Sequence, residues 1–320
     1  MVFIEPSVEL IEEKDPYKKI ELAGRTCYKS EDKITNDSAI KFVKALIKRE
    51  HYAMLEHQVF VFEILGSPNI SYNKFKDYIY YLKKDKYLNV TDDIIKVGEN
   101  DYQIRYLVSG NVRAICQRNV NDPLFREIYS KYSYLCFGAG LICNKIFEDC
   151  EASIVNIDDI INTMSYNEII NHVYYTFKII TDRGVTHELV RHRPCSFAQE
   201  STRYVNYKNG LSIALPSGFY DRPNEVQLVY QKAFEAANMF YHDLIEYCGQ
   251  TPQQARAVLP SATKTEIVVT ANFEEWIHII NLRYFGTTGA PHPDIKFVIE
   301  KVFNELKKDK LIGDLLEKEM

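Results

Sequence analysis

A proline directly follows three basic or protonatable residues near the middle of the 320-residue chain, in the run Arg191-His192-Arg193-Pro194. Proline has no backbone N–H and cannot continue helical hydrogen bonding. We therefore expect the short helix predicted over Val185–His192 to end here and the chain to continue as an extended loop. A strand at Tyr174–Ile180 and a turn at 182–184 are predicted to precede that helix. The basic residues thus lie at a predicted helix C-terminus, where positive charge is favourable.

Residues 191–205 are dense in hydrogen-bond donors, since Ser201 and Arg203 follow the basic triplet. A guanidinium group binds phosphate with two parallel hydrogen bonds, which makes an anionic ligand such as a nucleotide a reasonable expectation. The alternatives are cations that merely cap a helix end, or a basic surface turn. Phe197 and Val205 within the run are not typical of a solvated block of charge.

The composition is that of a globular protein, with 46% hydrophobic and 26% charged residues. A net charge of −5 excludes a general basic field for nucleic acid, so any phosphate site has to be local. The 7 cysteines form no CxxC pair and show no zinc-like spacing with histidine, so we expect a reducing environment and no metal site. No secretory signal or membrane-spanning run is recognised, and we expect a cytoplasmic protein.

Helices and strands are predicted to alternate irregularly along the chain. A strand is predicted at Val59–Leu65 and another at Ile267–Thr270, and helices are predicted at 39–47, 224–247, 252–259, 272–283 and 294–306. Because no regular βαβ alternation is seen, the fold class is predicted to be α+β. No internal repeat or low-complexity linker divides the chain, which favours a single domain over residues 1–320.

The pattern Arg-His-Arg, seven residues, Ser resembles the defining motif of the flavin-dependent thymidylate synthases. Further fragments are similar to segments of that family in the same order along the chain. They are Ala23–Tyr28, His51 with Leu55-Glu56-His57 and Phe60-Val61-Phe62, Arg183–Glu188, Ala255–Pro260, Asn272, Asn281-Leu282-Arg283 and Pro291–Asp294. Each fragment is weak alone, but their shared order around a specific motif is informative.

The resemblance covers roughly residues 1–65 and 174–300, and it implies a small mixed or antiparallel sheet flanked by helices. The stretch at about 67–168 matches nothing in the family and is interpreted as a helical insertion, with helices near Phe75–Leu82 and Phe125–Phe137. Extra packing or an oligomer contact is the default role for it. Val108–Arg113 within it is expected to be a hairpin or a loop on the substrate side.

The resemblance also implies a set of site residues. For the flavin cofactor, FAD, they are His51, Ala53, Arg191, His192, Arg193, Gln199, Asn272, Glu274, His278 and His292. For the nucleotide dUMP, they are Glu188, Leu189, Val190, Arg191, Gln199, Glu200, Ser201, Thr202, Arg203, Arg256 and Arg283. Arg283 is the expected catalytic residue, placed against the uracil edge to favour its ionisation. Arg256 is expected to hold the phosphate from a neighbouring subunit of a homotetramer.

The implied reaction is the reductive methylation of dUMP to dTMP. Its co-substrates would be 5,10-methylenetetrahydrofolate as carbon donor and NADPH, which reduces FAD. Three positions depart from the family pattern: Glu188 replaces a frequent Gln, Ala53 a Ser or Thr, and Glu274 an Arg.

Other interpretations stay open at this stage. A non-catalytic nucleotide- or RNA-binding protein could use the same arginines with Phe197 and Tyr204. Another flavoprotein, such as an NADPH oxidase or a uridine-modifying enzyme, is a third candidate. The absence of a glycine-rich dinucleotide fingerprint disfavours a Rossmann dehydrogenase. Asn272 could simply cap a helix and His278 could be a core histidine, whereas Ser201 has no evident base to activate it as a nucleophile.

Overall fold

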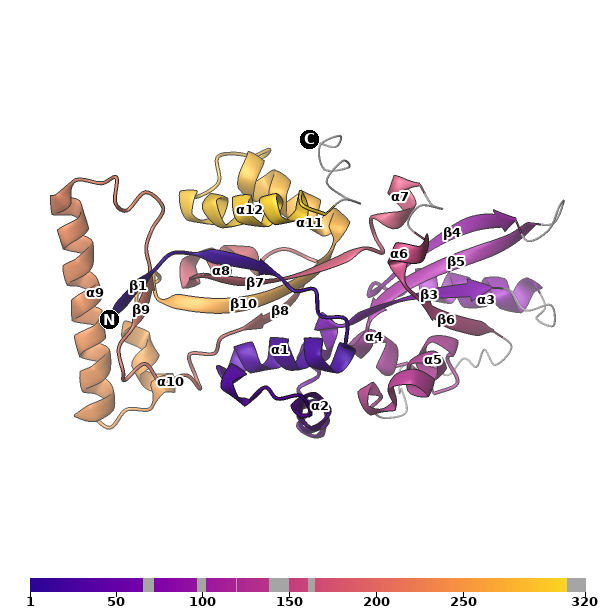
Figure 1. The fold of residues 1–320 in the computed structure, drawn as a ribbon, viewed down its shortest axis with the longest axis horizontal. Helices are drawn as coiled ribbons and strands as arrows, with labels where there is room; N and C mark the ends of the chain where they lie inside the picture. Colours follow the sequence, from indigo (N-terminus) through magenta and orange to yellow (C-terminus); the bar gives the residue numbers. More distant parts are fainter. Residues whose placement is uncertain (66–71, 97–101, 119, 138–149, 161–164, 310–320) are drawn as a thin grey trace.

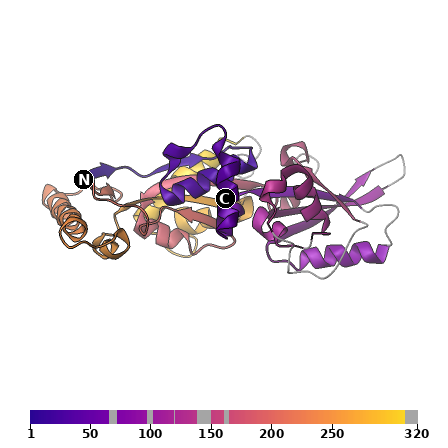
Figure 2. The ribbon, with the colours of Figure 1, turned by 90° about the horizontal axis from the view of Figure 1, so that it is seen from below.

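The computed structural model describes residues 1–65, 72–96, 102–118, 120–137, 150–160 and 165–309. Within these ranges the strands form two four-stranded sheets and one two-stranded sheet. The molecule is elongated, with a central sheet between a long helix at one end and the second four-stranded sheet at the other (Figures 1 and 2). The α+β class predicted from the sequence is confirmed.

The central sheet is antiparallel and has the order β2-β7-β10-β8. These strands are β2 (Ser7–Leu10), β7 (Tyr174–Asp182), β10 (Lys264–Asn272) and β8 (Ser196–Gln199). Every residue of β10 after Lys264 is buried, because helices cover both faces of the sheet (Figure 1). The strands predicted at 174–180 and 267–270 are confirmed. The segment after Pro194, expected to be an extended loop, pairs with β10 as an edge strand.

One face of this sheet carries α11 (Phe273–Ile280) and α12 (Pro293–Leu306), and the other carries α1 (Pro16–Tyr28), beside which lies α2 (Ser38–Lys48). Trp276 of α11 is fully buried against Phe177 of β7, with ring planes 82° apart. The helix predicted at 272–283 ends its regular α part at Ile280 and continues as a π-helical turn over Asn281–Phe285.

The short helix before the motif is α8 (Arg183–Leu189). Asp182 caps it, since its carboxylate accepts a hydrogen bond of 2.8 Å from the N–H of Val185. The sequence predicted this helix over 185–192. The cap explains the earlier start, and the helix ends at Leu189, ahead of Pro194.

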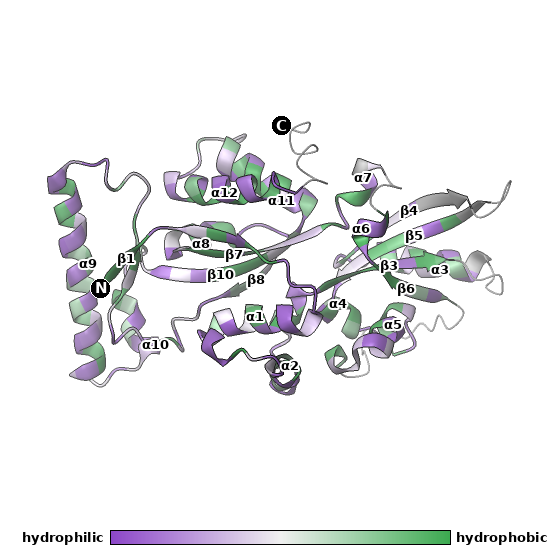
Figure 3. Cartoon of the chain, in the orientation of Figure 1, coloured by the Kyte–Doolittle hydropathy of each residue, from purple (hydrophilic) through white to green (hydrophobic). Residues whose placement is uncertain are grey.

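The chain around the N-terminus and α9 forms one end of the molecule. β1 (Val2–Ile4) pairs in parallel with β9 (Ser212–Ala214), and the 23-residue helix α9 (Asn224–Glu246) lies beside them. The helix predicted from 252 is shorter than expected: α10 spans Pro252–Ala255 and a 3₁₀ turn, Arg256–Val258, follows. Hydrophobic and hydrophilic residues alternate along α9 (Figure 3). No described helix is both long and apolar enough to cross a membrane.

The second sheet is antiparallel with the order β4-β5-β3-β6. It contains β4 (Leu88–Lys96), β5 (Tyr102–Asn111), β3 (Val59–Leu65) and β6 (Glu151–Val155). The helices of this region are α3 (Tyr72–Lys83), α4 (Val112–Cys116), α5 (Pro123–Tyr132), α6 (Ile157–Ile160) and α7 (Tyr166–Ile169).

The stretch at about 67–168 therefore contains strands in addition to the helices expected from its sequence. Helices α3 and α5 match the two predicted ones, but β4, β5 and β6 were not foreseen. They pair with the predicted strand β3, so this strand belongs to the second sheet and not to the central one. The segment 108–113 forms the end of β5 and the start of α4, not a hairpin.

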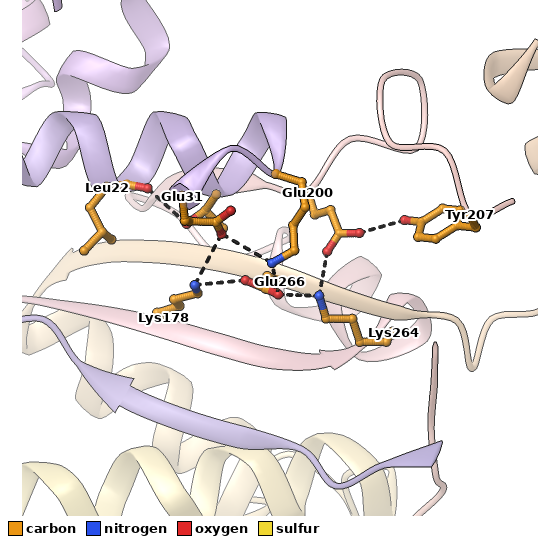
Figure 4. Close-up of polar contacts among 9 residues, drawn as sticks. Leu22, Glu31, Lys178, Glu200, Tyr207, Lys264 and Glu266 are labelled. Carbon is orange, nitrogen blue, oxygen red and sulfur yellow. Dashed lines mark hydrogen bonds and ion pairs between the residues drawn. The ribbon is translucent and has the colours of Figure 1, made fainter. Parts of the chain in front are cut away.

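A cluster of charged residues joins α1 and the loop after β8 to the central sheet (Figure 4). The carboxylate of the buried Glu266 on β10 contacts the ammonium groups of Lys29, Lys178 and Lys264. Lys264 also lies 2.9 Å from Glu200, which accepts a hydrogen bond of 2.8 Å from the hydroxyl of Tyr207. Burial alone would raise the pKa of Glu266, but hydrogen bonds from the three lysines outweigh it and lower the pKa to about 2.

Candidate functional site

Arg283 on the π-helical turn is held by two residues from the motif region. Its Nη1 donates to Oε2 of Glu188 at 3.0 Å, and its Nε donates to Nε2 of His192 at 3.4 Å. All three side chains are at least partly shielded from water. The acidic residue at 188, a departure from the family pattern, thus has a structural explanation, because it forms an ion pair with the expected catalytic arginine.

His192 is fixed in one neutral form by its neighbours. Its Nδ1 donates to the carbonyl of Leu189 at 2.9 Å, which leaves Nε2 to accept from Arg283. Burial lowers the pKa of His192, and the positive charge of Arg283 lowers it further. His278 is exposed, with its ring centroid 6.2 Å from that of His192, so the interpretation of His278 as a core residue is wrong.

A cavity of about 260 Å³ lies beside α8 and is lined by several basic residues. Arg183 and His187 line it from α8, four residues apart and hence on one face of the helix, and Arg256 lines it from the 3₁₀ turn after α10. Thr202 and Ser261 add hydroxyl groups. Two of these residues, Thr202 and Arg256, belong to the nucleotide site predicted from the sequence. Arg256 was expected to reach the phosphate from a neighbouring subunit, whereas here it lines a cavity together with Arg183 of its own chain.

Arg183, which lines this cavity, also has a buried donor without a partner within the described part of the chain. The Nη1 of Arg183 is buried and makes no hydrogen bond. A buried guanidinium N–H without an acceptor is costly, and an acceptor that reached it would remove this cost. The chemistry of the cavity walls therefore suits a phosphate group.

A second cavity, of about 290 Å³, lies on the other side of the motif. Arg193–Ser196 line it together with Thr270 and Asn272 of β10, and Glu56 closes it from the segment before β3. Asn272 has one of the two roles weighed from the sequence, that of a helix cap. Its side chain caps α11 by accepting from the N–H of Glu275 at 3.0 Å, and it also faces this cavity.

Other residues predicted for the nucleotide are already engaged within the chain. Leu189 is fully buried in the core, and its carbonyl accepts a hydrogen bond from His192. Glu200 contacts Lys264 and Tyr207. Gln199 donates to Thr186 at 2.9 Å, and Arg203 donates to Gln253 at 2.9 Å. Val190 is half-buried, and its carbonyl accepts a hydrogen bond from the side chain of Arg193. Ser201 is half-buried with its hydroxyl 3.3 Å from the N–H of Arg203.

The remaining residues predicted for the cofactor are spread over the surface. Ala53, Arg191 and Glu274 are exposed. His51 is exposed and its Nδ1 lies 2.6 Å from the hydroxyl of Tyr28. His292 caps α12 and lines a third cavity, which it shares with Glu188. The structure of one chain thus brings together Arg193 and Asn272 but not these residues.

Sequence reasoning did not select Arg183, His187, Glu56, Lys86 or Tyr87, although all five line the cavities beside the motif. Arg183 was expected in the turn before the predicted helix, so its place on one helical face with His187 followed only from the observed start of α8 at Arg183. The sequence held no signal for Lys86 and Tyr87, because only tertiary packing places their turn beside the motif.

The family model that matches the chain and the similar proteins indicate the same family. The family model described as "Thymidylate synthase complementing protein" matches residues 9–75 and 134–309. A protein of Mycobacterium avium named flavin-dependent thymidylate synthase is 35% identical over 143 residues, which are 40% of this chain and 54% of that protein. One of the same name from Geobacter sulfurreducens is 34% identical over 152 residues, or 47% of this chain and 64% of that protein. The matched part of the chain spans about half the length of the first of these relatives.

Solved structures resemble the chain more distantly. A UMP/dUMP methylase, PolB of Streptomyces cacaoi bound with 5-Br dUMP, is 15% identical with a TM-score of 0.41, and the match covers 96% of this chain and 93% of that one. Thymidylate synthase X of Helicobacter pylori with FAD and dUMP is 20% identical with a TM-score of 0.36, covering 51% and 80%.

Proposed function

Because the chain belongs to the family of thymidylate synthase complementing proteins, we propose that it is a flavin-dependent thymidylate synthase. It would convert dUMP to dTMP with 5,10-methylenetetrahydrofolate as carbon donor, FAD as cofactor and NADPH as reductant. The observation that carries this proposal is the cavity beside α8, which Arg183, His187 and Arg256 line. A nucleotide phosphate would accept hydrogen bonds from such cationic groups.

The base of the nucleotide would lie toward Arg283. Helix α8 bears Arg183 and His187 on the side of the phosphate cavity and Glu188 on the side of Arg283. A guanidinium held by Glu188 and His192 is preorganised, so it can stabilise negative charge that develops on a uracil ring without first reorienting. This supports the assignment of Arg283 as the catalytic residue, with Glu188 and His192 as residues that position it.

The cavity between Arg193 and Asn272 fits part of a flavin nucleotide. Its walls combine a guanidinium, amide groups and backbone, which are the groups that bind diphosphates and heterocycles. At about 290 Å³ it can take one end of FAD and not the whole dinucleotide. Bound there, FAD would supply the hydride chemistry, while Arg193 would pair with its charge and Asn272 would hydrogen-bond its ring or ribose.

We extend the proposal to assembly and location. Few residues of α9 are buried, and Val229 and Phe240 expose 68% and 53% of their surface. An amphipathic helix with exposed apolar side chains suits contact with another copy of the chain. We therefore propose a homotetramer. We also propose a single domain over 1–320 and a cytoplasmic location. The insertion, expected at about 67–168, is narrower by the family model, which leaves only residues 76–133 of this stretch unmatched.

The direct test is an assay for dTMP with purified protein, FAD, NADPH, methylenetetrahydrofolate and dUMP, each omitted in turn and with UMP as an alternative substrate. Product that requires every component supports the proposal. Consumption of NADPH without dTMP contradicts it and favours another flavoprotein. Binding of RNA without bound flavin favours the non-catalytic alternative.

A binding measurement tests the phosphate cavity separately. Calorimetric titration should show that dUMP binds more tightly than deoxyuridine, and that Arg183→Ala removes most of this difference. A hydrogen bond to a charged group contributes about 1.5–3 kcal/mol, so dUMP should bind roughly 10- to 100-fold more weakly to the variant. Lys41→Ala, which removes an exposed cation of α2, is the matched control and should change neither affinity. Equal loss of dUMP and deoxyuridine would contradict the assignment.

A further inference from the structure

The cavity beside the motif continues into a smaller one of about 120 Å³. The two share Glu56, Tyr87 and Asn111 as lining residues, so they form one cleft. This cleft separates the central sheet from the second sheet. We refer to it as the inter-sheet cleft.

The two walls of the inter-sheet cleft come from different parts of the chain. Arg193–Ser196, Thr270 and Asn272 form the wall on the central sheet. The opposite wall consists of residues from the second sheet and its helices, namely Lys86, Tyr87, Asn89, Asn111, Arg113, Ala114 and Gln117. This opposite wall falls within residues 76–133, which the family model leaves unmatched. The insertion therefore shapes a cavity that the motif also lines.

Hydrogen bonds fix the insertion against the central sheet at this point. The Nδ2 of Asn89 donates to the carbonyl of Asn171 at 3.0 Å and to the hydroxyl of Tyr174 at 2.7 Å. The buried His172 lies between Thr91 and Ser109, with ring nitrogens 2.7 and 2.9 Å from their hydroxyl oxygens. The turn with Lys86 and Tyr87 immediately precedes β4, so it is held at a defined distance from Arg193.

The side chains of Lys86 and Tyr87 in this turn line the cleft, where they can contact a ligand. Tyr87 exposes 59% of its surface while lining both parts of the cleft, and Lys86 holds its ammonium group 4.9 Å from the centre of the Tyr87 ring. Arg193 adds a second positive charge from the opposite wall. The charge of Arg113 is already compensated by Glu56, whose Oε1 lies 2.6 Å away. The cleft thus offers an aromatic face flanked by two cations.

We propose that Lys86 and Tyr87 form a ligand-binding wall for a flat heteroaromatic ring that carries anionic groups. The ring would stack on Tyr87, and an anionic group would pair with Lys86. This inference rests on the proposed function, whose reaction involves two ligands of this chemistry: FAD, with its diphosphate, and a folate, with its carboxylates. The insertion then contributes to binding and not only to packing.

The test measures binding by the full-length protein, not activity. FAD is titrated by the change in flavin fluorescence, and tetrahydrofolate by calorimetry in the presence of saturating FAD and dUMP. Tyr87→Ala and Lys86→Ala are compared with the wild type. The control pair is Tyr80→Ala and Lys84→Ala, because Tyr80 is 60% exposed and Lys84 lies 4.3 Å from its ring centre, yet neither lines the cleft.

We expect Tyr87→Ala to weaken binding of the ligand by about tenfold, as loss of a stacking contact predicts. Lys86→Ala should weaken binding of the same ligand by up to about fivefold, as loss of an exposed charge contact predicts, while the control variants stay within twofold. Weaker FAD binding identifies the wall as part of the flavin site, and weaker folate binding identifies it as part of the folate site. If the wild type binds both ligands and the variants bind them equally well, the inference is wrong and the proposed function stands. If the wild type binds neither, both fail together. Urea unfolding of all four variants verifies that they are folded.

Discussion

Replacing Glu266 with glutamine removes a carboxylate that three lysines share while keeping the size of the side chain. The native contacts lower its pKa from 4.5 to about 2. Each pKa unit corresponds to about 1.4 kcal/mol, so ionised Glu266 contributes ~3 kcal/mol to folding at pH 7. The variant also leaves Lys29, Lys178 and Lys264 facing each other with less compensation, and breaking a buried ion pair typically costs about 3–5 kcal/mol.

We therefore expect Glu266→Gln to lower the free energy of unfolding by about 3 kcal/mol. Urea unfolding at pH 7, followed by circular dichroism, measures this difference. Asp92→Asn is the matched control, because Asp92 forms a pair with Lys83 at 2.7 Å in which both side chains are about half exposed. An exposed pair of this kind contributes about 0–1 kcal/mol.

The dependence on pH provides a second, independent readout. A carboxylate with a lowered folded-state pKa stabilises the protein above its unfolded pKa of 4.5, and this contribution is lost as the pH falls toward about 2. The difference between wild type and Glu266→Gln should therefore shrink over that range. A variant within 1 kcal/mol of the wild type at pH 7, or a difference that does not change with pH, would refute the reasoning.

Three further predictions concern other groups. Burial raises the pKa of Glu275 to about 7, so the contribution of this residue to folding stability falls as the pH rises from 4.5 to 7. In thermal unfolding, Glu275→Gln should therefore be more stable than the wild type by about 1–3 kcal/mol at pH 8, but not at pH 4. Burial lowers the pKa of His172 to about 4, so stability should fall as the pH drops from 6.5 to 4, and unfolding of His172→Gln should depend less on pH there. Arg283→Ala should lower kcat/KM for dTMP formation by about 100-fold or more with unchanged FAD affinity, whereas Glu188→Gln should stay within about tenfold; loss of flavin from Arg283→Ala would contradict its assignment to the substrate.

The sequence carried the local signals well. Asn272 caps α11, Thr251 and Gln254 form a capping box at the start of α10, and Pro194 lies beyond the end of α8, whereas the cap that Asp182 provides for α8 was not predicted. Such signals act between residues within one helical turn, so they can be read without knowing the fold. The order of motifs along the chain likewise predicted the family that the family model matches.

Contacts between distant segments could not be foreseen in this way. The segment after Pro194 forms a strand because it pairs with β10 at the edge of the central sheet. Strand β3 pairs with β5 and β6 of the second sheet and not with the central sheet. Alternation of apolar residues predicts that a strand has a buried face, but it does not say which strand lies beside it.

The same division holds for the site. The sequence by itself determined which residue types are present near the motif, including the arginines, His192 and Asn272. Only the tertiary structure decided that Arg183 meets Arg256 across a cavity and that Tyr87 faces the motif. These residues are far apart in the chain, and their proximity results from packing of whole sheets and helices, which depends on many side chains at once and on no single local pattern.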